Sequence, residues 1–292
     1  MNAHAFFLTV VVLAAPTAGA AGQAPLDAPW DSVGSILRTS GTATGDYYRY
    51  GWPRRDLTVR VGDVTVSPTL ALGAWAGFSG EAADATVMGD LVLTANELKP
   101  VLAELARQRI AVTAIHNHLV GEQPPITYVH FHAQGNALDL AGRLDRVLAL
   151  TAAPRPVAAA PPQPVTIDTA QVFAALGLRG RAQGAVAQVS TVLVPGQVTI
   201  HGRPVTPALG YGSPINIQQV GPGRAVATGD FAVLGSKVAP MLDALAAYGI
   251  TATAVHSHLV GEQPPIYYIH FWADGPLAEV LRGLRAGLDA AR

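Results

Sequence analysis

The sequence predicts an α+β fold built as two tandem homologous domains, each a mainly antiparallel sheet with flanking helices. The chain repeats itself, because His116–Pro125 reads HNHLVGEQPP and His256–Pro265 reads HSHLVGEQPP, at an offset of 140 residues. Within each copy, consecutive strand patterns stand beside segments of helical periodicity, which favours a sheet covered by helices. A period this long indicates duplicated domains and excludes a solenoid of short repeats.

The elements of the first copy follow from local patterns. Residues 57–66 alternate around Gly62-Asp63 as a pair of strands, and 70–79 and 85–93 are two further strands. Thr94 and Glu97 form a capping-box pattern, so a helix is predicted to begin there. Each copy then closes with an amphipathic helix, over 138–148 in the first and 277–284 in the second.

The predicted organisation has four segments. Residues 5–15 are an apolar run followed by small residues, which predicts a signal peptide over 1–20. The first domain is expected over 28–151 and the second over 165–292, joined by a linker over 152–164 that holds five prolines. We therefore expect an exported protein, periplasmic or extracellular. The apolar run is too short to span a bilayer, and no Cys follows the cleavage site to carry a lipid anchor.

Composition limits the chemistry. The formal net charge is −1 and only 13% of residues are charged, whereas nucleic-acid binding needs a clear excess of Lys and Arg. The chain has no Cys, so disulfides, thiolate nucleophiles and iron–sulfur clusters are excluded. Imidazole and carboxylate remain as the groups for strong chemistry.

Histidines concentrate in the repeated motif, where seven of the nine occur. On the strands 111–118 and 126–132, His116 and His118 share one face, as do His130 and His132. A symmetric hairpin centred on Pro124 would place His118 opposite His130 and His116 opposite His132, close enough for several imidazoles to share one ion.

The second copy repeats this pattern with His256, His258 and His270, and Trp272 takes the fourth corner. Neutral imidazole is a common ligand of transition metals, so the hairpins predict a site for a divalent ion such as Zn, Cu, Mn or Fe. Glu122 adds a carboxylate to this motif, either as a ligand or as a general base beside a metal-bound water. The predicted metal ligands are His116, His118, His130, His132, His256, His258, His270 and Glu262.

The histidine faces have an alternative interpretation, because they can instead form hydrogen-bonded ladders with Tyr and backbone groups, or a pH switch. Asp90 and Asp230 are expected to occupy turns.

Residues 45–57 combine aromatic side chains with Arg49, Arg54 and Arg55, which suggests contact with an anion or a carbohydrate. The alternative for this segment is a strand with Arg–Asp pairs on its solvent face.

The strings AIHNHLVGEQPP, YVHFHAQG and MGDLVLT, with PRRDL followed by LALGAWAGF, resemble the LppY/LpqO-type family of bacterial exported proteins. The resemblance covers residues 30–150 and, as a second copy, 165–290. The family has no established activity. The resemblance implies an extracytoplasmic location. By direct match it points to His116, His118, Glu122, His130 and His132.

Three functions remain open at this stage. The first is a secreted metal-binding protein with a possible metal-dependent hydrolase activity, in which the ion keeps an open coordination position. The second is a periplasmic metal-binding or buffering protein without turnover. The third is an envelope module that binds a small molecule or a cell-envelope ligand without metal. The sequence leaves the oligomeric state and the metal open.

Overall fold

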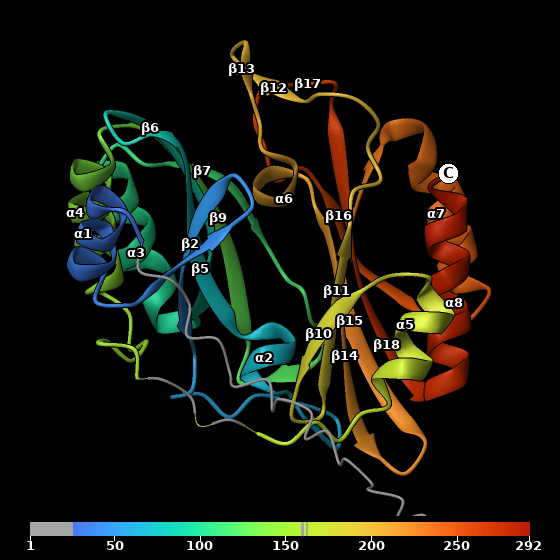
Figure 1. Cartoon of the computed structure of the whole chain (residues 1–292). Coiled ribbons are helices and arrows are strands. Elements are labelled where there is room, and N and C mark those ends of the chain that lie inside the picture. The colour runs from blue at the N-terminus through green and yellow to red at the C-terminus, as the bar shows by residue number, and fades with distance from the viewer. Residues whose placement is uncertain (1–25, 159–160, 162) are drawn as a thin grey trace, which may run out of the picture.

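Two six-stranded sheets face each other across the middle of the protein, and helices cover their outer faces (Figure 1). The computed structural model describes residues 26–158, 161 and 163–292, so the signal peptide expected over 1–20 lies outside the described residues. Helices α1 (Ala28–Leu37), α3 (Ala95–Arg107) and α4 (Ala137–Leu148) flank the first sheet. Helices α5 (Thr169–Leu176), α7 (Gly235–Ala246) and α8 (Leu277–Ala290) flank the second.

The first sheet is antiparallel and has the order β1-β2-β5-β6-β9-β7. Its strands are β1 (Gly41–Thr44), β2 (Tyr47–Pro53), β5 (Gly73–Glu81), β6 (Asp84–Thr94), β9 (Ile126–Gly135) and β7 (Ala111–His116). A small sheet of β4 (Val64–Thr65), β3 (Arg60–Val61) and β8 (Glu122–Gln123) stands beside it. The short helix α2 (Pro68–Ala71) follows β4 along the chain.

The second sheet repeats this topology as β10-β11-β14-β15-β18-β16. Its strands are β10 (Gly180–Gln183), β11 (Val186–Thr191), β14 (Ser213–Gly221), β15 (Arg224–Leu234), β18 (Ile266–Pro276) and β16 (Thr251–His256). The accompanying small sheet comprises β13 (Arg203–Pro204), β12 (Thr199–Ile200) and β17 (Glu262–Gln263), and α6 (Pro207–Gly210) corresponds to α2. The predicted fold class, two tandem α+β domains with antiparallel sheets, is confirmed.

Local chemistry explains how the site-bearing strands are held. Helix α3 begins as expected, because the Thr94 amide donates to Glu97 Oε2 at 2.8 Å in a complete capping box. Gly89 lets neighbouring strands approach closely, since a Cβ there would stand 2.3 Å from the Trp75 carbonyl oxygen. Gly229 is equivalent, with a Cβ 2.1 Å from the Pro214 carbonyl oxygen. Both copies therefore need glycine at this point of the long central strand.

The symmetric hairpin predicted around Pro124 is wrong. In the structure His116 stands opposite Tyr128 and Ala114 opposite His130, with a bulge between Val112 and Ala114. The reason is that Glu122 and Gln123 leave the hairpin and pair with β3. The connection is therefore a separate strand, and the register of β7 against β9 is shifted from that of a simple turn.

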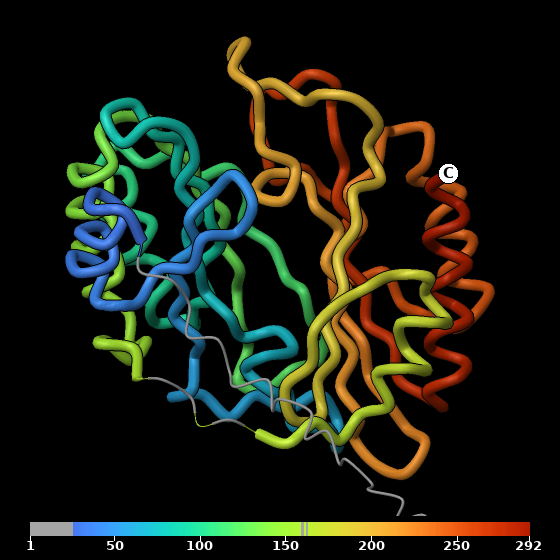
Figure 2. The backbone as a smooth tube through the Cα atoms, in the orientation of Figure 1, coloured from blue at the N-terminus to red at the C-terminus, as the bar shows by residue number. Residues whose placement is uncertain are grey.

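Each domain places its short helix, α2 or α6, beside the other domain, as the course of the backbone shows (Figure 2). On one side, Gln188 and Asn216 of the second domain donate to the carbonyls of Thr69 and Leu70 in α2, at 3.0 and 2.8 Å. On the other side, an apolar cluster joins Tyr47 and Met88 of the first domain to residues of the second that include Leu209 of α6. These contacts fix the inner faces of the two sheets against each other.

Within the described part of the chain, no helix has both the length and the apolar character needed to cross a membrane.

Candidate metal centre

Histidines from both domains meet between the two sheets. We call His116, His118 and His130 the first triad, His256, His258 and His270 the second triad, and the six together the histidine cluster. The shortest contacts between the triads are reciprocal. The equivalent residues His116 and His256 have ring centroids 4.1 Å apart, and the second histidine of each triad meets the third histidine of the other, at 4.0 Å for His118 and His270 and 3.8 Å for His130 and His258. The sequence predicted histidine sites in each copy, and the structure brings them together as one cluster.

In the second triad three ring nitrogens converge. The Nε2 atom of His270 lies 2.8 Å from Nε2 of His256 and 3.0 Å from Nε2 of His258. With metal–nitrogen bonds of ~2.0–2.1 Å, two nitrogens on one ion stand about 2.9 Å apart at a right angle and about 3.4 Å apart at the tetrahedral angle. The observed separations therefore match the edge of a metal coordination sphere.

The outer ring nitrogens explain this arrangement. The Nδ1 atom of His256 lies 3.0 Å from the Ser257 carbonyl oxygen, and Nδ1 of His270 lies 2.6 Å from Asp230 Oδ1, although without hydrogen-bond alignment. A carbonyl or carboxylate beside Nδ1 favours a proton there and leaves the lone pair on Nε2. Two Nε2 lone pairs that face each other at 2.8 Å require a proton or a metal ion between them.

In the first domain the polar atoms are buried without partners. Both ring nitrogens of His116, the Nε2 atoms of His118 and His130, and Oδ1 of Asp90 have no hydrogen bond. Buried polar atoms in native proteins normally have a hydrogen-bond partner, so these atoms indicate a place where a ligand, a water molecule or an ion binds. Within the described residues, three sets have ligand atoms within 4.8 Å of one another: His116/His256/His258/His270, His116/His118/His130 and His118/Asp230/His270.

Burial keeps the imidazoles in the form that binds metals. Burial and repulsion by neighbouring imidazoles lower the pKa of His256 to about 4. The same causes lower the pKa of four others well below the usual range: His116, His118, His130 and His258. Burial, with the nearby Asp230 carboxylate, raises the pKa of Asp90 well above its usual range. These five imidazoles are thus neutral near pH 7, and they lie beside two carboxyl groups, a donor set that suits a cation.

The turn role expected for Asp90 and Asp230 is wrong. Each lies inside a long central strand, directly opposite the third histidine of its own triad. Asp90 is 6% exposed and stands 3.9 Å from both His118 and His130. The signal that could have found them is present in the sequence, because Gly89-Asp90 and Gly229-Asp230 recur at the offset of the histidine motif.

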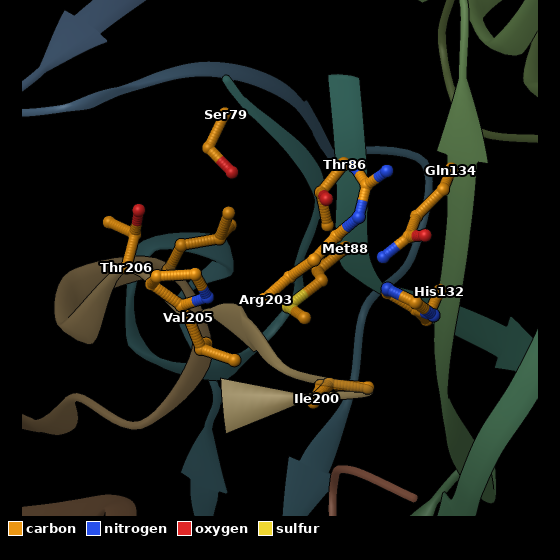
Figure 3. Close-up of a pocket in the computed structure, with 11 residues that line it drawn as sticks. Ser79, Thr86, Met88, His132, Gln134, Ile200, Arg203, Val205 and Thr206 are labelled. Carbon is orange, nitrogen blue, oxygen red and sulfur yellow. The ribbon is translucent and has the colours of Figure 1, made fainter. Parts of the chain in front are cut away.

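His132 lies outside the three sets, at a small cavity between the domains (Figure 3). Met88 and Gln134 line this cavity from the first domain, and Ile200 and Arg203 line it from the second. The Nε2 atom of His132 is buried without a partner there, and burial lowers its pKa. The structure thus separates His132 from the other histidines of its motif.

The two motif glutamates begin the short strands β8 and β17, in the second half of the connection between the histidine-bearing strands. Oε1 of Glu122 accepts from the Ile126 amide at 3.2 Å, and Oε1 of Glu262 accepts from the Ile266 amide at 3.0 Å. Glu122 is 6% exposed and Glu262 is 7% exposed. Each carboxylate thereby holds the segment that carries its histidines, and neither belongs to the three sets.

The three arginines of 45–57 have separate positions. Arg54 is 1% exposed and its guanidinium pairs with Asp56 and Glu97, each at 2.8 Å. The guanidinium carbon of Arg49 lies 4.0 Å from the centre of the Trp75 ring. Arg55 donates to the Ala158 carbonyl at 2.8 Å. The structure does not bring these guanidinium groups together around one cavity among the described residues.

The fold and the centre define a tandem-repeat α+β protein whose halves share one histidine cluster. Residues 31–150 and 170–290 both match the family described as Domain of Unknown Function (DUF1259). These stretches cover more than half of the chain, so the protein belongs to this family and carries two tandem copies of its domain.

Comparison with curated proteins finds no match. Among solved structures, the chain is similar to a fused permuted hexameric shell protein from the RMM microcompartment, with 14% identity, a TM-score of 0.18, and coverage of 72% of this chain and 86% of that one. It is also similar to EtuB from Clostridium kluyveri, with 12% identity, a TM-score of 0.21, and coverage of 86% and 89%. These TM-scores are too low for either likeness to inform the fold or the function.

Proposed function

We propose that this protein binds a divalent transition metal at the histidine cluster. The observation that carries the proposal is the convergence of the three Nε2 atoms of the second triad, at 2.8 and 3.0 Å, with Nδ1 of His256 and His270 beside a carbonyl and a carboxylate. His116 completes this set from the first domain. The ion is thus held by both halves of the chain.

The donor set narrows the choice of metal. Zn, Cu, Mn and Fe were all compatible with the sequence, but a centre of four imidazoles suits Zn(II) or Cu(II) better than Mn(II), which prefers oxygen ligands. When bound, such an ion supplies positive charge and Lewis acidity. The residues of this chain would orient the ligands, since Asp230 lies beside Nδ1 of His270 and the Ser257 carbonyl lies beside Nδ1 of His256.

Burial favours binding without turnover over hydrolysis. His270 is 0%, His258 6% and His116 9% exposed, whereas a catalytic ion needs a position open to water and substrate. Glu122, a candidate general base, accepts a backbone hydrogen bond from Ile126. Hydrolysis would require the first triad to keep a position open.

The third function, a module with hydrogen-bonded His faces, is less favoured by the contacts. The hydroxyl groups of Tyr128 and Tyr268 donate to the carbonyls of Ala71 and Gly210, and they are not partners of the histidines. The buried ring nitrogens of the first triad that have no hydrogen-bond partner fit ligands of a cation better than members of a hydrogen-bonded ladder.

We further propose that the family relationship is of the LppY/LpqO type and that the chain is exported, as the motifs and the apolar run over 5–15 suggest. Under this proposal residues 1–20 are removed, and domains over 28–151 and 165–292 flank the linker over 152–164. Edman sequencing or mass spectrometry of the secreted protein tests the cleavage site, since a retained N-terminus would contradict it.

Elemental analysis tests the central proposal. The purified protein is stripped with a chelator, incubated separately with Zn(II), Cu(II), Mn(II) and Fe(II), desalted and analysed. Wild type should retain at least one equivalent of Zn(II) or Cu(II), and the double variant His256→Ala/His270→Ala should lose it. His201→Asn is the matched control, because His201 is exposed, lies outside the cluster, and has a φ of 50° that Asn tolerates. Less than a tenth of an equivalent in wild type would overturn the proposal.

A further inference from the structure

We infer that the histidine cluster is a dinuclear centre. One ion is held at the second triad, and another is held by the first triad and Asp90. This inference rests on the proposed function and goes beyond it, because it assigns two ions and different ligands to each. His118 and His130 bind the ion at the first triad. His116 is within reach of both ions.

The two triads resemble each other in the distances from their first histidine. Ring centroids of His116 stand 4.9 Å from His118 and 5.0 Å from His130. The corresponding distances from His256 are 4.8 Å to His258 and 4.9 Å to His270. The ligand atoms of His116, His118 and His130 also lie within 4.8 Å of one another, so the three rings of the first triad can bind one ion.

The unpaired atoms lie mainly at the first triad. One ion at the second triad, with His116 as its fourth ligand, still leaves other buried atoms of the first domain without a hydrogen-bond partner. Those atoms are Nε2 of His118, Nε2 of His130 and Oδ1 of Asp90. A second cation bound by them would give each a partner.

The position of Asp90 supports the same conclusion. Its two carboxyl oxygens lie 3.9 Å from Nε2 of His118 and 3.9 Å from Nε2 of His130. One carboxyl group and the imidazoles of the first triad therefore lie close enough together to serve as a mixed oxygen and nitrogen donor set, which suits a divalent transition metal.

His116 connects the two positions. It belongs to both the His116/His256/His258/His270 and the His116/His118/His130 sets, and neither of its ring nitrogens has a hydrogen-bond partner. Its ring stands 4.1 Å from His256 and 4.5 Å from His270. One nitrogen can therefore bind each ion, and the remaining ring proton passes to solvent when both are bound.

Copper stoichiometry combined with electron paramagnetic resonance tests the inference. Stripped protein is titrated with Cu(II), and the copper content of desalted samples is compared with the integrated spin. Wild type should bind two equivalents, and its integrated spin should be less than half of its copper because ions linked through one imidazole couple. His118→Ala/His130→Ala should bind one equivalent with full spin, and His201→Asn should match wild type.

The outcomes separate the two proposals. A wild-type plateau at one equivalent with full spin would overturn the dinuclear centre and leave the proposed metal binding intact. No retained copper or zinc would overturn both. If His118→Ala/His130→Ala does not fold, as judged by circular dichroism, Asp90→Asn replaces it, and there the second equivalent should bind at least tenfold more weakly while the first is unchanged. Equal affinity for both equivalents in Asp90→Asn would contradict the role of Asp90.

Discussion

The Asp230 carboxylate offers the sharpest single test of the second triad. Its Oδ1 lies 2.6 Å from Nδ1 of His270, a ring that is 0% exposed and whose Nε2 faces two other imidazoles. Carboxylates that hold a metal-bound histidine in this way fix its tautomer and raise its basicity. Asp230→Asn keeps the shape of the side chain and removes its charge. We therefore expect metal affinity to fall by roughly 10- to 100-fold, or about 1.4–2.7 kcal/mol.

Competition with a chromophoric chelator measures this change directly for Zn(II) and Cu(II). Asp274→Asn is the matched control, because Asp274 lies on β18, the strand that carries His270, is exposed and pairs with Arg224. It should leave the metal affinity within about twofold of wild type, since its carboxylate touches no histidine of the cluster.

The alternative role for Asp230 is to hold the buried His270 ring in place whether or not a metal is bound. In that case Asp230→Asn would lower the thermal stability of the metal-free protein and leave the metal affinity unchanged. An affinity equal to that of wild type would therefore refute the metal-orienting role of Asp230.

Three further predictions concern stability. Zn(II) or Cu(II) at about 100 times its Kd should stabilise the fold by about 2.7 kcal/mol and raise Tm by roughly 5–10 °C in calorimetry, and a chelator should reverse the shift. Without metal, each histidine with a lowered pKa, such as His116, should contribute fully to the free energy of unfolding above pH 6.5. Below that pH its contribution should fall by about 1.4 kcal/mol per pH unit, because the unfolded chain binds the proton first. The raised pKa of Asp90 acts in the opposite direction and offsets about one proton. A urea midpoint that does not change between pH 7.5 and 5.5 would contradict this. Arg54→Met should cost about 3–5 kcal/mol in urea unfolding, because it leaves the Glu97 carboxylate buried without its partner, and a loss below 1 kcal/mol would contradict the buried pair.

The sequence was sufficient for the architecture because the relevant signals are local or repeated. The capping box at Thr94 and Glu97 depends on four consecutive residues, and the structure contains it. The duplicated motif around His116 and His256 predicted two tandem domains, and both the fold and the family match agree. His116 and His118 do lie close together, with ring centroids 4.9 Å apart, as the sequence predicted. The strand β7 ends at His116, however, so strand alternation is not what brings His118 to this place.

The composition of the centre could not be obtained in this way, because it depends on contacts between segments far apart in the chain. No local sequence pattern predicts that the rings of His118 and His270 stand 4.0 Å apart, or that His132 lines a separate cavity. The hairpin register was missed because β8 pairs with β3, a contact between residues about sixty positions apart. Asp230 was missed because a Gly-Asp pair within a buried strand looks like a turn when its neighbours are not known.

The covalent link between the two copies has a consequence for how the centre assembles. A centre divided between two separate subunits would come apart on dilution, whereas here both triads belong to one polypeptide, and their encounter does not depend on protein concentration. The fusion also frees each half from having to match the other. His132 and Trp272 occupy equivalent places in the repeat yet differ in chemistry, a divergence that two identical subunits could not reach.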